Sequence, residues 1–224
     1  MTAMAVWWEV CALSLALVHG AGLVPRLPEP PDGADLGKIP YAGLTTRRRL
    51  AGLITMTLAA QMATVFAAPA QRPMWLVYGS AVAALAWVDA CTTWLPSRLS
   101  WLVSAELAIA AAVTLCCGGG RLELTVRLLA GAATSWFLWW AAYHLSHGGF
   151  GFGDVRLAPL TGAMAATMGA SGWLAALLAT TVLGALWGLL TAHRHPAPGT
   201  SRGFAYGPWL WAGPYVALVW IAVM

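Results

Sequence analysis

Apolar stretches about as long as a membrane is thick follow one another along almost the whole chain. A helix needs roughly 20 apolar residues to cross the hydrocarbon core, and eight such spans use about 160 residues. The chain has 224 residues, of which 60% are hydrophobic and 9% charged, and its mean hydropathy is +0.71. Soluble domains carry about a quarter charged residues. The composition therefore excludes a soluble enzyme, a nucleic-acid-binding module and a secreted disulfide scaffold, and predicts an all-α, polytopic transmembrane bundle.

The Pro- and Gly-rich breaks between the apolar stretches divide the chain into eight predicted spans. The first transmembrane span occupies residues 1–24, a cytoplasmic loop occupies 25–49, and a seven-span core occupies 50–224. The first span lacks a basic beginning and carries Glu9, which indicates a retained helix and not a cleaved signal peptide. Spans within the core are expected at about 50–68, 74–95, 99–117, 122–145, 154–168, 173–192 and 209–224.

The distribution of basic residues predicts how these spans are oriented. Short cytoplasmic loops of membrane proteins retain Lys and Arg. If the N-terminus is outside, the outer loops hold only Arg72 and Arg121. The inner loops then hold Arg26, Lys38, Arg47, Arg48, Arg49, Arg98, Arg156, Arg194 and Arg202. Both termini are therefore predicted to face outside.

Three carboxylates, Asp89, Glu106 and Asp154, lie in or beside predicted spans. Ionisable groups there are costly and are functional candidates. The predicted topology brings Asp89 and Asp154 to the same membrane face at similar depth. Neighbouring carboxyl groups do not both ionise easily, so one stays protonated. Such a pair supplies the base and the acid that hydrolyse a peptide bond without a metal, and Gly151 and Gly153 allow the backbone to approach a substrate closely.

Other interpretations of these residues remain open at this point. Asp154 is also suited to cap the helix that follows it, and Asp89 to form a structural ion pair with Arg98 or Arg156. Glu106 is expected to be a packing polar residue. Intramembrane acids also serve proton relays, so an ion-coupled transporter is an alternative function. A pilus-assembly scaffold without catalysis is another.

Four short motifs occur in order along the predicted spans: Arg26-Leu27-Pro28, Trp87 to Leu99 with Pro96 seven residues after Asp89, Gly151-Phe152-Gly153-Asp154-Val155-Arg156-Leu157, and Phe204 to Trp209. The third motif resembles the G-x-G-D-x-K/R signature of type IV prepilin leader peptidases. The second is similar to the segment around that family's first aspartate. The first and fourth resemble the Arg-Leu-Pro that ends the family's first span and the aromatic-Gly-Pro element that opens its last. The resemblance covers the chain from about residue 20 to its end.

This resemblance implies a membrane aspartic endopeptidase of the bacterial inner membrane. Its substrate would be a type IV prepilin or pseudopilin, cut at the cytoplasmic face behind a short basic leader. Asp89 and Asp154 would be the catalytic pair. The supporting residues would be Gly151, Gly153, Arg156 and Pro96, with Arg156 keeping the positive charge of the commoner Lys.

The chain also departs from larger members of that family. Many of them carry four zinc-binding cysteines in the first inner loop, whereas the segment 25–49 has none. Larger members N-methylate the new terminus with S-adenosylmethionine, and without that domain we expect no methylation. The four cysteines form no C-x-x-C pair, so we expect no metal. The sequence therefore predicts an enzyme without a cofactor, whose partners are its substrate and the lipid bilayer and not nucleic acid; its oligomeric state is left open.

Overall fold

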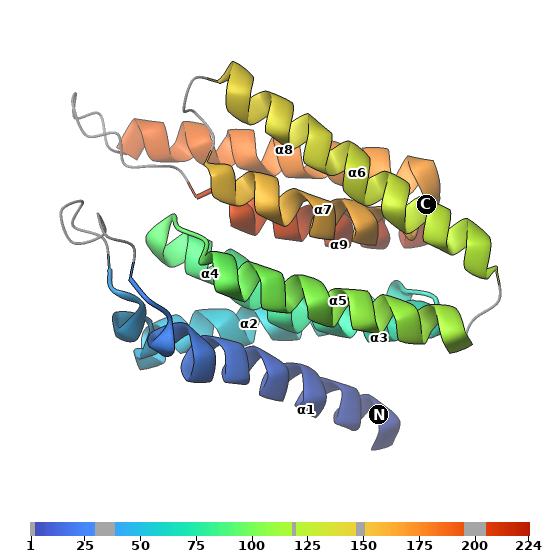
Figure 1. Ribbon diagram of the computed structural model, residues 1–224, viewed down its shortest axis with the longest axis horizontal. Coiled ribbons are helices and arrows are strands. Elements are labelled where there is room, and N and C mark those ends of the chain that lie inside the picture. Colours follow the sequence, from blue (N-terminus) through green and yellow to red (C-terminus); the bar gives the residue numbers. More distant parts are fainter. Residues whose placement is uncertain (1–2, 30–38, 118–119, 147–150, 195–204) are drawn as a thin grey trace.

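Helices account for nearly all of the regular structure. The computed structural model describes residues 3–29, 39–117, 120–146, 151–194 and 205–224, and within these ranges no strand occurs. The helices lie side by side with their long axes in roughly the same direction (Figure 1). The predicted all-α class is therefore confirmed.

Within the ranges that the structure describes, the α-helices form eight rods, in the order of the eight predicted spans. A π-helical turn at Val18–Leu23 extends α1, and another at Tyr78–Val82 joins α3 to α4 in one rod. The helices are α1 (Ala3–Leu17), α2 (Arg47–Ala63), α3 (Arg72–Val77), α4 (Ala83–Thr92), α5 (Ser97–Cys117), α6 (Arg121–Leu145), α7 (Phe152–Ala166), α8 (Gly169–Arg194) and α9 (Gly207–Val223).

Five of these rods are long and apolar enough to cross a membrane. They are Trp7–Arg26, Arg47–Phe66, Pro69–Thr92, Ser97–Cys117 and Gly169–Thr191. The helix α9 is apolar but shorter, α7 is shorter still, and α6 is long enough but less apolar. The transmembrane character is thus shown, and the count of eight spans stays a prediction.

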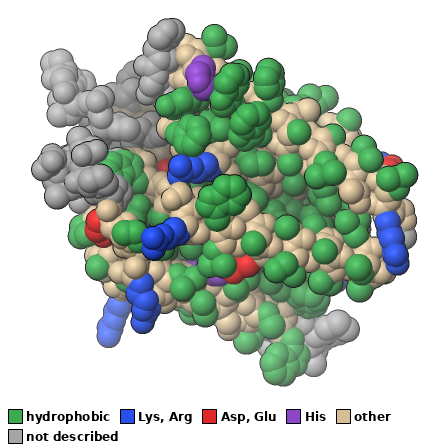
Figure 2. Space-filling model, in the orientation of Figure 1, with side chains coloured by type: hydrophobic (Ala, Val, Ile, Leu, Met, Phe, Trp, Pro, Cys, Tyr) green, Lys and Arg blue, Asp and Glu red, His purple; other side chains and the backbone are tan. Residues whose placement is uncertain are grey.

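The outside of the bundle is rich in large apolar side chains. Trp7, Met62, Trp101, Leu122 and Leu145 are each exposed. On the face drawn in Figure 2, hydrophobic side chains cover most of the surface, and Lys and Arg lie in its left half and at its right-hand edge. A soluble protein rarely exposes so much apolar surface, whereas lipid tails solvate it.

The second rod begins earlier than the sequence predicts. The helix α2 starts at Arg47, inside the segment predicted to be loop, because the N–H groups of Arg49 and Leu50 already donate to the Thr46 carbonyl. The predicted boundary followed the change from polar to apolar residues. A helix continues through that change when its first turn reaches beyond the hydrocarbon.

Aromatic residues fix α9 against the rod that contains α3 and α4. The Tyr215 ring lies 5.2 Å from the Trp75 ring and 5.5 Å from the Tyr78 ring, between centroids. The Tyr78 hydroxyl donates to the Trp211 carbonyl at 3.0 Å, and the Trp211 indole N–H donates to the Tyr78 carbonyl at 3.1 Å. The helices α1–α5 make up one group and the helices α6–α9 the other. These reciprocal hydrogen bonds join the two groups.

Small residues bring α6 and α7 into close contact, which sets the position of the α7 N-terminus. A methyl group on Gly162 would lie 2.3 Å from the Gly131 carbonyl oxygen and 2.2 Å from Ser135 Oγ. Small residues at such crossings let two backbones approach each other within a membrane.

We predict that Gly162→Ala destabilises the protein, because the added methyl group has no space at the α6–α7 crossing. Overpacking of this kind costs about 1–3 kcal/mol. The measurement is thermal unfolding of the purified protein in detergent. Gly188→Ala is the control, because nothing lies within 4 Å of a methyl group there. Equal melting temperatures for the two variants would contradict the packing argument.

Candidate active site

Asp89 lies in the last turn of α4, at the end of the bundle where α4 turns into α5. The helix ends at Thr92, and Thr93 adopts a left-handed conformation with φ of 57°. Pro96 precedes α5, and a residue before proline is disfavoured in a helix. The Asp89 side chain is only 5% exposed.

The Asp89 carboxylate is held by the first turn of α9. The Gly207 N–H donates to Asp89 Oδ2 at 2.8 Å. The first N–H groups of a helix have no partner within it, and Pro208 has no N–H at all. A methyl group on Gly207 would lie 2.6 Å from Asp89 Oδ2, so only glycine allows this approach.

Asp154 lies in the first turn of α7 and is likewise 5% exposed. The Gly151 N–H donates to Asp154 Oδ2 at 3.3 Å, and the Asp154 N–H donates to the Gly151 carbonyl at 3.1 Å. The interpretation of Asp154 as a capping residue is therefore correct in its geometry. Capping does not exclude catalysis, because the second carboxylate oxygen takes no part in this bond.

The structure brings Asp89 and Asp154 together. They come from α4 and α7, in different helix groups, and their carboxyl groups lie close enough to interact electrostatically. The Tyr206 side chain also lies within electrostatic range of Asp154, and its hydroxyl donates to the Thr180 carbonyl at 3.1 Å. Two buried carboxyl groups that interact in this way do not both ionise easily, so one of them keeps a proton.

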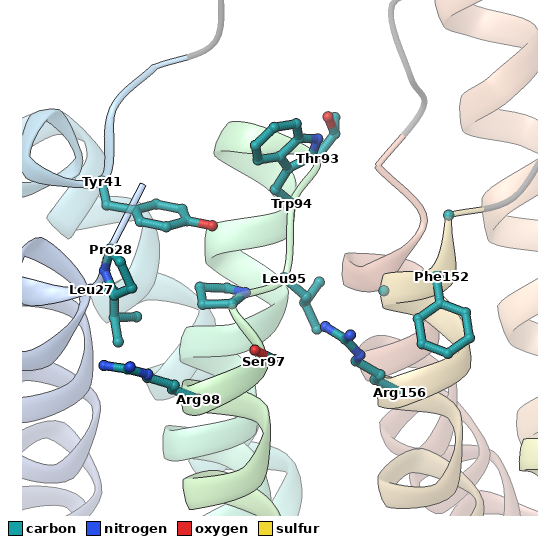
Figure 3. A pocket seen from close by; sticks show the side chains of 13 residues that line it. Leu27, Pro28, Tyr41, Thr93, Trp94, Leu95, Ser97, Arg98, Phe152 and Arg156 are labelled. Carbon is teal, nitrogen blue, oxygen red and sulfur yellow. The ribbon is translucent and has the colours of Figure 1, made fainter. Parts of the chain in front are cut away.

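A pocket of about 500 Å³ is lined by Gly151 and Gly153, which come just before Asp154 in the chain. Figure 3 shows the side chains around it. Its lining comes from three places: the segment after α1 with Tyr41, the turn between α4 and α5, and the start of α7. The four predicted supporting residues all line it, namely Pro96, Gly151, Gly153 and Arg156. Arg98, at the start of α5, adds a second cation.

The pocket lining includes the phenol hydroxyl of Tyr41, which stays protonated. Burial, together with the neighbouring Glu29 carboxylate, raises the pKa of Tyr41 to about 12. The Tyr41 N–H donates to Glu29 Oε1 at 2.5 Å, which fixes the segment on which the ring is carried. At neutral pH the Tyr41 hydroxyl is therefore available as a donor to a bound group.

Leu95, in the turn between α4 and α5, packs against Gly153 at the start of α7. It lines the pocket, and a methyl group on Gly153 would lie 3.3 Å from its Cδ1. Neither aspartate belongs to the pocket lining. The carboxyl groups are therefore covered in this conformation, and Leu95 is the pocket residue packed against the residue before Asp154.

The remaining sequence candidates have other places. Glu106 binds His19, with Nε2 of the buried histidine 3.1 Å from Glu106 Oε1, so it is not part of the aspartate pair. The Arg156 guanidinium lies 5.1 Å from the centroid of the Phe152 ring. Among the residues that the structure describes, no three His, Cys, Asp or Glu side chains gather as a metal site.

Sequence reasoning missed three contributors to the site. Gly207 stood in a recognised motif, but nothing in the sequence indicated that its N–H donates to Asp89. Tyr41 carried no signal, and Leu95 stood in the motif around Asp89 without an assigned role, because both roles depend on which segments meet at this end of the bundle. Aromatic-Gly-Pro at the start of a predicted span is the one pattern that pointed to Gly207.

Comparisons with known proteins leave the site to be interpreted from its own residues. No protein-family model, curated protein or solved structure matches the chain.

We predict that Gly207→Ala lowers the melting temperature in detergent, because its methyl group displaces the Asp89 carboxylate. The loss of a charged hydrogen bond and the clash together cost about 2–4 kcal/mol. Asp89→Asn keeps an acceptor oxygen and should therefore lower the melting temperature less. Gly52→Ala is the control, since its nearest neighbour would be 4.0 Å away.

A double variant separates the clash from a general effect on α9. In the Asp89→Ala background, Gly207→Ala should destabilise the protein less than it does in the wild type, because the carboxylate is gone. Additive effects would contradict the Asp89–Gly207 contact.

Proposed function

We propose that the chain is a membrane aspartic endopeptidase of the prepilin peptidase type. Its substrate would be a type IV prepilin or pseudopilin, and it would remove the basic leader at the cytoplasmic face of the bacterial inner membrane. The observation that carries the proposal is the meeting of Asp89 and Asp154, buried at one end of the bundle beside a pocket. Their motifs resemble those that carry the two aspartates of that family.

The orientation required by this proposal is eight spans with both termini outside. The pocket end would then face the cytoplasm, which agrees with the predicted excess of basic residues there. Arg98 and Arg156 belong to that end and line the pocket.

The two carboxyl groups would divide the chemistry between them. The 2.8 Å bond from Gly207 is shorter than the 3.3 Å bond from Gly151, and it comes from the positive end of α9. This favours the negative charge on Asp89 and the shared proton on Asp154. Asp89 would then take a proton from water while Asp154 donates to the peptide carbonyl oxygen.

The reaction balances as simple hydrolysis. The water oxygen bonds to the carbonyl carbon, the carbon–nitrogen bond breaks, and a proton passes to the leaving amine. The products are a leader with a new carboxylate and a mature chain with a new amino terminus. No cofactor is needed for this step, and we propose no N-methylation.

Substrate access would require movement of the turn between α4 and α5. The aspartates are covered, Leu95 packs on Gly153, and Thr93 holds a left-handed conformation that a β-branched residue rarely adopts. Displacing this turn would open the pocket to the carboxyl groups. An extended substrate segment could then lie against the backbone of Gly151 and Gly153.

We predict that Asp89→Asn and Asp154→Asn each reduce leader cleavage at least about a hundredfold, because either change removes the acid–base pair. The measurement is co-expression with a prepilin from the same genome, followed by gel shift and N-terminal mass. Glu106→Gln is the control, since Glu106 contacts His19 and not the aspartates. Each variant is checked for membrane insertion.

Each outcome of this experiment has a definite meaning. Cleavage by both aspartate variants at the wild-type rate would make the carboxylates structural and refute the mechanism. An inert wild type on several prepilins would favour an ion-coupled transporter or a scaffold. The buried His19–Glu106 pair would then be the first candidate for a proton relay. An added methyl group in the product mass would refute the expectation of no methylation.

Arg156→Ala should weaken cleavage much less than the aspartate substitutions. The Arg156 side chain is exposed on the pocket wall, where a charge contributes about 1 kcal/mol, or roughly fivefold. Because it is expected to act on substrate binding, KM should rise while kcat changes little. Arg156→Lys should retain wild-type kinetics. A large fall in kcat for both variants would contradict a role of Arg156 in substrate binding.

A further inference from the structure

A second cavity, of about 90 Å³, lies at the opposite end of the bundle from the aspartates. It is formed by the first half of α1, the end of α2 and the start of α3. Four of its lining residues are polar or charged, namely Glu9, Gln61, Thr64 and Arg72. Its volume suits a headgroup fragment and excludes long apolar chains.

Two residues of this lining, Gln61 and Arg72, carry buried donors without an acceptor. Gln61 is 8% exposed, and neither its Nε2 nor the Nε of Arg72 has a hydrogen-bond partner among the described residues. One turn deeper on the same helices, Thr57 Oγ1 and Trp75 Nε1 are also unpartnered within that part of the chain. Buried donors normally find an acceptor, because leaving them unpaired is costly. Both side chains border the cavity, so a rotation of each toward it would bring these donors to the acceptor oxygens of a ligand.

Opposite charges share the cavity without forming an ion pair. Glu9 and Arg72 both line it, yet no Glu9–Arg72 contact within 4.0 Å occurs in the described structure. Inside a membrane, charged side chains usually pair directly. Their separation leaves space for one ligand that carries a negative group for Arg72 and a positive group for Glu9.

The surroundings of the cavity match the headgroup level of a bilayer. Gln61 lies in the last turn of α2 and Arg72 opens α3, so both are near helix ends. The neighbouring side chains of Trp8, Met62 and Val65 are exposed and apolar. Lipid tails can lie along these side chains while a headgroup enters the cavity.

We propose that this cavity binds a zwitterionic phospholipid with an ammonium headgroup, such as phosphatidylethanolamine. The phosphate oxygens accept from Arg72 and Gln61, and the ammonium group lies at Glu9. The acyl chains pass out along Trp8 and Val65. A headgroup of zero net charge matches a cavity whose formal charges also cancel.

The test is native mass spectrometry of the full chain in detergent, titrated with phosphatidylethanolamine or with phosphatidylglycerol of the same acyl chains. We expect the wild type to bind phosphatidylethanolamine at least tenfold more tightly. Arg72→Gln and Gln61→Met should each weaken that binding about tenfold. Glu9→Gln should remove the preference between the two lipids. The control is Arg121→Gln, an exposed arginine at the start of α6, which should bind as the wild type does.

Three results would overturn the proposal. The first is unchanged lipid binding by both Gln61→Met and Arg72→Gln, with melting temperatures that show intact folding. The second is equal binding of the two lipids by the wild type, which would remove the role of Glu9. The third is saturation by inorganic phosphate alone at the concentrations that bind lipid, which would identify a soluble anion as the ligand.

Discussion

The hydrogen bond from the Gly207 N–H to the Asp89 carboxylate connects the two halves of the bundle at the site itself. Asp89 belongs to the α1–α5 group and Gly207 to the α6–α9 group. Helix N-terminal N–H groups in a membrane need a partner, because no water is available to provide one. The carboxylate satisfies that need, and it brings Asp89 to the α9 N-terminus and within electrostatic range of Asp154. Aromatic packing between Tyr215, Trp75 and Tyr78 holds α9 in the same register.

Capping and the proposed catalysis would therefore be parts of one arrangement at this site. Each aspartate accepts an N–H from a helix N-terminus, Asp89 from α9 and Asp154 from the start of its own helix α7. A helix N-terminus stabilises negative charge, which partly offsets the cost of burying it. Two buried carboxyl groups within electrostatic range of each other still disfavour double ionisation. The bonds of unequal length then provide a physical reason for the two groups to differ in protonation, which acid–base hydrolysis requires.

The sequence predicted the positions of the helical rods well, because apolar stretches and the prolines and glycines between them mark helix ends directly. It also predicted that Asp89 and Asp154 lie at the same membrane face at similar depth, and the resemblance of their motifs made them a pair, but their proximity depends on how α4 and α7 pack. It failed at Arg47, where the helix extends past the apolar segment. It gave no sign of Tyr41 or the polar cavity at Gln61, and it assigned no role to Leu95, because these depend on how distant rods pack. Local sequence patterns indicate which secondary structure a segment favours, but they do not indicate which distant segment packs against it.

The covered aspartates are consistent with the demands of proteolysis inside a membrane. An open pair of carboxyl groups would expose a charge to lipid and admit water without a substrate. With Leu95 against Gly153 and both aspartates 5% exposed, the charge is kept within protein. The nearby left-handed Thr93 places conformational strain in the turn that separates pocket and pair. A substrate of the proposed kind that filled the pocket would contact that same turn, because Trp94, Leu95 and Pro96 line the pocket. The free energy of substrate binding in the pocket would therefore offset the cost of displacing the turn, which would expose the two carboxyl groups.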